Sequence, residues 1–196
     1  MRRKILLSFF IFFVLKGFSQ PAETFTDKRD GQTYKTVILG SQTWMAENLN
    51  YKIENSWCYA DSADNCKIYG RLYTWKTAMN SCPDNWHLPG EEEWKILEKF
   101  LGMSEEETKV FLYCGEGTGT KLMSKTGFNA LLGGRRLYTD GSFDGKGKTG
   151  VWWSSTTELY KGNTYAFRRE IFSDKSGIDW DAATPTLGFS VRCVKN

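Results

Sequence analysis

Apolar positions recur at helical spacing in one stretch of the chain, immediately after Pro89. Trp94, Leu97 and Leu101 are three or four residues apart, the spacing at which side chains line one face of an α-helix. A residue that precedes proline avoids the helical conformation, so the helix can begin only at about Gly90. Glutamates in the first turn complement the partial positive charge of a helix N-terminus. The pattern predicts a helix from about Gly90 to Leu101.

Runs rich in β-branched and aromatic residues predict strands in both halves of the chain. The predicted strands are Tyr34–Leu39, Gln42–Ala46, Phe128–Leu132, Val151–Thr156, Thr164–Phe172 and Phe189–Val194. The first two flank Gly40-Ser41, a two-residue turn that joins antiparallel strands, so we expect a hairpin near the start of the domain.

Two more helices are expected. One covers about Thr74–Ser81. The other begins at Ser104 and continues to about Tyr113, because Ser104 stands three residues before Glu107 in the pattern of a capping box. No internal repeat or linker interrupts residues 20–196, which therefore form one domain. The fold class is α+β, with a few twisted antiparallel strands, two main helices and long ordered loops.

The N-terminus has the pattern of a secretory signal peptide at residues 1–19. The basic head Met1–Lys4 is followed by Ile5–Leu15, which is apolar except for Ser8, and then by small residues before Gln20. This apolar run is much shorter than the roughly 20 residues that cross a bilayer. We therefore expect an exported protein, extracellular, outer-surface or periplasmic, with no membrane span in the mature chain.

Removal of residues 1–19 also changes the charge. The chain has 26 basic and 23 acidic side chains, and four of the basic ones lie in the leader, so the mature domain has 22 against 23. A net charge of about −1 does not favour nucleic acid as a partner.

The five cysteines are Cys58, Cys66, Cys82, Cys114 and Cys193. Most should pair in an oxidising compartment, and about 15 arrangements with one cysteine left over are possible. Cys58 and Cys66 bracket a short, turn-rich loop that has too few apolar residues to hold itself, so a disulfide between them is expected. Their spacing is poor for zinc.

Seven motifs stand out along the chain: Asp30–Tyr34, Gln42–Leu49, Tyr69–Trp75, Trp86–Trp94, Gly127–Ala130, Trp153–Thr156 and Gly188–Cys193. In their order they resemble the motifs of the Fibrobacter succinogenes major paralogous domain. Trp86–Trp94 also resembles, more distantly, a motif of C-type-lectin-like folds of the formylglycine-generating type. The resemblance covers about residues 25–196. It implies a C-type-lectin-like fold in which Cys82, at the end of the first helix, pairs with Cys193 in the last strand. Cys114 is then left as a buried free thiol or, alternatively, as a reactive or intermolecular one.

No catalytic residue is expected. His87 is the only histidine and lies in a turn that defines the fold, which favours a structural role over general-base catalysis. Related oxidases use a cysteine pair near the last strand, and no other cysteine follows Cys114 and precedes Cys193. The glycine-rich segment Gly115–Lys121 lacks the spacing of a phosphate-binding loop.

No cofactor is expected, although structural calcium is possible at clustered aspartates. The candidates are Asp61 with Asp64, Asp140 with Asp144, and Asp174 with Asp179 and Asp181. None follows an EF-hand pattern, and solvated turn aspartates are the alternative.

Six residues in the second half of the chain are candidates for ligand binding, because aromatic rings stack on sugars and polar groups beside them fix orientation. They are Trp152, Tyr160, Tyr165, Trp180, Arg136 and Asp179. For each aromatic residue, packing in the core or a loop is the alternative. We therefore expect a non-catalytic secreted or cell-surface module for binding or adhesion, whose partner is a polysaccharide or a surface protein. The alternative is an enzyme related to the formylglycine-generating oxidases, or a hydrolase.

Overall fold

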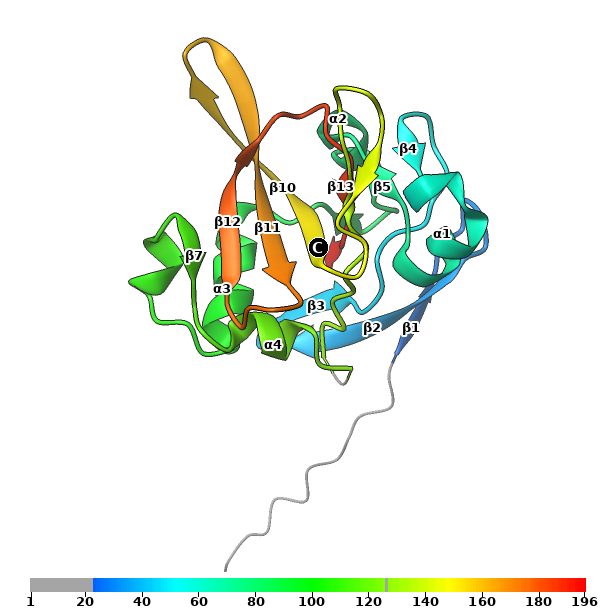
Figure 1. Cartoon of the computed structure of the whole chain (residues 1–196). Helices are drawn as coiled ribbons and strands as arrows, with labels where there is room; N and C mark the ends of the chain where they lie inside the picture. Colours follow the sequence, from blue (N-terminus) through cyan, green and yellow to red (C-terminus); the bar gives the residue numbers. More distant parts are fainter. Residues whose placement is uncertain (1–22, 126) are drawn as a thin grey trace, which may run out of the picture.

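The computed structural model describes residues 23–125 and 127–196 (Figure 1). The predicted signal peptide lies outside these residues. Within them the larger sheet has seven strands in the order β4-β5-β13-β10-β11-β12-β7. The bounds are β4 Ser56–Trp57, β5 Leu72–Tyr73, β13 Phe189–Ser190, β10 Thr149–Tyr160, β11 Asn163–Phe172, β12 Ile178–Ala183 and β7 Leu112–Cys114.

A second sheet of the described residues has five strands in the order β1-β2-β3-β14-β6, and β8 pairs with β9 alone. The bounds are β1 Thr24–Thr26, β2 Thr33–Leu39, β3 Gln42–Met45, β14 Val194–Lys195, β6 Trp86–His87, β8 Arg135–Arg136 and β9 Phe143–Asp144. The helices are α1 Ala63–Tyr69, α2 Trp75–Ala78, α3 Glu91–Phe100 and α4 Thr118–Leu122, with single 3₁₀ turns at Tyr59–Asp61 and Glu107–Lys109. Of the described strand pairs, only β10 and β13 run parallel. The fold class is therefore α+β, as the sequence predicts.

The larger sheet is buried on both faces where β10 and β11 cross the body of the domain. Successive residues of a strand point to opposite faces, so Trp152 and Trp153 enter different groups of buried side chains. Trp152 joins the group that contains Trp94 and Leu97 of α3, whereas Trp153 joins the group that contains Phe189. Helix α3 therefore covers one of the two faces.

Helix α3 confirms the strongest prediction from the sequence pattern. The backbone N–H of Gly90 donates to the carboxylate of Glu93 at 2.8 Å, which completes the start of the helix without a capping hydroxyl. The backbone N–H of Glu91 donates to Thr156 Oγ1 at 3.1 Å and so attaches the helix to β10. The predicted hairpin is also present as β2 and β3.

Other predicted elements are wrong in part. The capping box of Ser104 and Glu107 forms, but only a 3₁₀ turn follows it, because the next residues pair with β12 as the edge strand β7. Helix α2 is shorter than predicted and ends at Ala78. The predicted strand Phe128–Leu132 is an irregular segment, in which the backbone N–H of Ala130 donates a hydrogen bond to Leu122 O. Helices α1 and α4 and strand β12 were not predicted.

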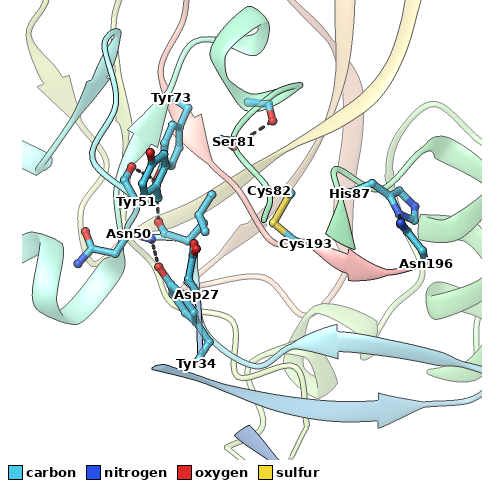
Figure 2. The surroundings of a disulfide bond; sticks show 12 residues. Asp27, Tyr34, Asn50, Tyr51, Tyr73, Ser81, Cys82, His87, Cys193 and Asn196 are labelled. Carbon is cyan, nitrogen blue, oxygen red and sulfur yellow. Dashed lines mark hydrogen bonds between the residues drawn. A yellow bond between two sulfur atoms is a disulfide. The ribbon is translucent and has the colours of Figure 1, made fainter. Parts of the chain in front are cut away.

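Both disulfides of the described residues join the pairs expected. Cys58 and Cys66 lie 8 positions apart, and Cys82 and Cys193 lie 111 positions apart. Figure 2 shows the second bond linking the segment after α2 to the segment before β14. Cys114 has no disulfide partner among the described residues and is half-buried.

The thiol of Cys114 is expected to react slowly. Burial, with a smaller contribution from nearby Glu98, raises its pKa to about 11. Only the thiolate is nucleophilic, so alkylation by iodoacetamide near neutral pH should be on the order of 100-fold slower than that of free cysteine. Mass spectrometry of samples quenched over time measures the rate, and the protein unfolded in urea is the control. Labelling of the folded protein at the rate of free cysteine would contradict this expectation and favour the reactive thiol.

Candidate binding site

The six predicted ligand-binding residues do not form one site. Trp152 is 1% exposed, and its indole N–H donates to Asn48 Oδ1 at 2.8 Å. Its placement on a binding surface is therefore corrected, because both faces of the sheet are covered at this position. Asp179 lies on β12 and accepts a hydrogen bond from Arg168 at 3.0 Å, on the face opposite to Trp180.

Three of the candidates share what we call the aromatic face, which comprises Phe111, Tyr160, Tyr165, Phe167 and Trp180. The strand register places Tyr160 opposite Asn163 and Tyr165 opposite Glu158, on the part of the β10–β11 hairpin that projects from the body in Figure 1. Trp180 is covered, because Phe111 stacks on it with ring centroids 4.1 Å apart. Its exposed fraction is only 6%, so its predicted role in contacting a ligand is also corrected, whereas Tyr160 is 56% exposed.

Arg136 lies in a different part of the molecule. Its guanidinium carbon is 4.0 Å from the centroid of the Trp57 ring, a cation–π contact between β8 and β4. Trp57 in turn lines an open pocket of about 540 Å³. The pocket is lined by Asn50, Lys52, Ser56, Trp57, Cys58, Asp61, Ala63, Cys66, Lys67 and Arg71.

Local structure explains how this pocket forms. Trp57 is held in register with Leu72 by the β4–β5 pairing, and the disulfide from Cys58 to Cys66 fixes α1 against the end of β4. Between the cysteines, Tyr59 packs against Phe143 with ring centroids 5.2 Å apart. The disulfide and this contact together hold the wall of the pocket in place.

Arg71 forms the polar side of the pocket. Its Nε donates to Ser56 Oγ at 2.9 Å and its Nη2 to Ser56 O at 2.8 Å. Its Nη1 lies 3.4 Å from Cys58 Sγ and 3.5 Å from Cys66 Sγ, and sulfur is a weak acceptor. The guanidinium is thus fixed in position, and no carboxylate among the described residues pairs with it.

Sequence reasoning missed Trp57 and Arg71. Both had a signal in the chain, because Trp57 directly precedes a cysteine of the predicted loop disulfide and Arg71 belongs to the Tyr69–Trp75 motif. The resemblance to lectin-like folds predicts a binding surface in the second half of the chain instead.

No group of three or more His, Cys, Asp or Glu side chains in the described part of the chain is arranged to hold a metal ion. Of the aspartates named as calcium candidates, Asp140 accepts bonds from Ser142, Asp144 pairs with Arg135, and Asp64 pairs with Lys67. These contacts are those of turn and surface aspartates.

His87 is engaged at both ring nitrogens. Nδ1 lies 2.5 Å from Asn196 Oδ1, and Figure 2 shows these two side chains together. Nε2 lies 2.7 Å from Glu93 Oε1, so the ring links β6, the start of α3 and the residue that follows β14. These two contacts fix the position of the ring between the three segments.

Two large sheets and one two-stranded sheet, short helices and two disulfides in the described residues define a disulfide-linked α+β domain with an open pocket. No helix within residues 23–125 and 127–196 is long and apolar enough to cross a membrane. Residues 37–195 match the model of the Fibrobacter succinogenes major domain, and the chain belongs to that family. Searches among curated proteins and among solved structures gave no match.

Proposed function

We propose that this protein is an exported, non-catalytic module that binds polysaccharide, and that a sugar unit occupies the pocket beside Trp57. The observation that carries the proposal is the combination, in one pocket, of an indole ring with hydrogen-bonding groups on Asn50 and Arg71. A sugar needs both, because its ring faces are apolar and its hydroxyls require partners.

Export and a lectin-like arrangement are part of the same proposal. Two disulfides favour an oxidising compartment, in agreement with the signal peptide that the sequence predicts. Strands β1 and β14 lie in one sheet, and the Cys82–Cys193 bond joins the segment after α2 to the segment before β14. These features support a C-type-lectin-like fold, in which the two ends of the domain are brought together.

An oxidase or hydrolase is the alternative, and two residues bear on it. His87 has both nitrogens engaged, and the pKa of the Cys114 thiol is raised to about 11 by burial. Neither residue is suited to act as a base or a nucleophile near neutral pH.

Trp57→Ala tests the proposal. Loss of the ring should weaken binding of the best polysaccharide in a panel of cell-wall polymers by roughly tenfold or more, equivalent to about 1.4 kcal/mol. Affinity electrophoresis and titration calorimetry measure the effect. Trp57→Phe keeps an aromatic ring and should retain most of the affinity.

Tyr160→Ala is the matched control, since it removes an exposed aromatic side chain from the aromatic face and leaves the pocket intact. Thermal melts check that each variant is folded. If Tyr160→Ala abolishes binding and Trp57→Ala does not, the aromatic face is the binding site and the assignment of the pocket is wrong. If no polysaccharide binds, the proposed function is wrong.

A further inference from the structure

The pocket has an excess of positive charge. Its lining contains Lys52, Lys67 and Arg71, against the single acidic side chain of Asp61 among the described residues. Lys67 pairs with Asp64 at 2.9 Å, so the excess comes mainly from Lys52 and Arg71. Arg136, stacked on Trp57, adds a further cation beside the pocket.

Arg71 differs from an ordinary surface arginine because its position is fixed before any ligand arrives. Ser56 holds Nε and Nη2, each through one hydrogen bond, and the disulfide sulfurs lie beside Nη1. A guanidinium has five N–H groups, so these four contacts leave one N–H of Nη2 free for a ligand, and the N–H groups of Nη1 face only weak sulfur acceptors. Little side-chain entropy remains to be lost when an anion binds.

We propose that this pocket selects a carboxylate-bearing sugar, the uronate unit of an acidic polysaccharide. The inference rests on the proposed function and names the class of ligand. The carboxylate accepts charge-assisted hydrogen bonds from Arg71, and Lys52 adds attraction from the rim, while the sugar ring packs against Trp57. Such bonds are about twice as strong as those between neutral groups. A neutral sugar would leave the excess charge of the pocket uncompensated.

The test compares one polymer in two forms. The secreted chain is titrated with polygalacturonate and with its methyl ester in buffer with 150 mM salt, together with neutral xylan, dextran sulfate and poly-L-glutamate. The acid form should bind on the order of tenfold more tightly than the ester, because esterification removes the charge and leaves the sugar unchanged.

Variants locate the effect. Arg71→Met should reduce the preference for acid over ester to about twofold or less, and Arg71→Lys should retain part of it. Lys52→Met changes an exposed side chain, is expected to leave folding unchanged, and should weaken binding of the acid form only. Lys28→Met removes one charge from the turn between β1 and β2, none of whose residues lines the pocket, and should change nothing.

The outcomes separate the two proposals. Equal binding of acid and ester, or binding of xylan alone, overturns the uronate assignment and leaves polysaccharide binding in place. If dextran sulfate binds as tightly as polygalacturonate and Lys28→Met weakens binding, the protein attracts anions in general, and the uronate assignment is again overturned. Tightest binding of poly-L-glutamate indicates an acidic peptide instead. Failure of every polysaccharide overturns the proposed function as well.

Discussion

Arg169→Met is expected to destabilise the domain by about 3–5 kcal/mol at neutral pH. Arg169 is fully buried on β11, and its ion pairs join it to two glutamates of α3: Nε lies 2.5 Å from Glu98 Oε1 and Nη1 lies 2.9 Å from Glu91 Oε2. Both glutamates are themselves buried. Removal of the arginine leaves two negative charges in the core without a cation, and that desolvation is not compensated.

Urea unfolding at pH 7 measures the cost. The matched control is Arg169→Met combined with Glu91→Gln and Glu98→Gln, which removes all three charges and should recover much of the loss. A loss below about 1 kcal/mol at pH 7 for the single variant would show that α3 is not anchored to the sheet by these charges.

Replacement of Cys82 and Cys193 by serine should be the other large effect. The bond closes a loop with a separation of 111 residues, and in the chain-entropy account its removal costs about 5 kcal/mol. The variant should melt well below the parent protein in differential scanning calorimetry, since the unfolded chain regains the conformational freedom that the bond removes.

The double variant Cys58→Ser with Cys66→Ser is the comparison. Its loop spans 8 positions, so the same account gives only about 2.5 kcal/mol. This smaller loss should be accompanied by weaker polysaccharide binding, because the bond shapes the pocket. Equal thermal losses for the two variants would show that native contacts at the sulfurs, rather than loop length, set the effect.

The sequence predicts those elements whose signal is local. Helix α3 follows from apolar spacing after Pro89, and the hairpin of β2 and β3 follows from its two-residue turn. Helix α1 has no comparable apolar stripe. It is held by the Cys58–Cys66 bond and by Asn65, whose side-chain amide donates to Tyr59 O at 2.8 Å. These contacts form only in the folded domain, so no local pattern in the sequence predicts the helix.

The candidate site was predicted less well, for a related reason. A tryptophan in a strand looks the same whether its face of the sheet is open or covered. Trp152 is covered by α3 and its neighbours, and Trp180 is covered by Phe111 from a segment that the pattern predicts as helix. Conversely, Trp57 lines a pocket only because α1 and Arg71 converge on it in three dimensions.

The Cys82–Cys193 bond also determines how the domain would respond to tension. A force that pulls β1 and β14 apart passes from Cys193 directly to Cys82 through covalent bonds. The intervening chain, which includes β7 and β10–β13, carries no load and cannot be drawn out. The segment that forms the pocket lies before Cys82, within the loaded path. Mechanical strain would therefore deform the pocket while the β10–β11 hairpin kept its shape.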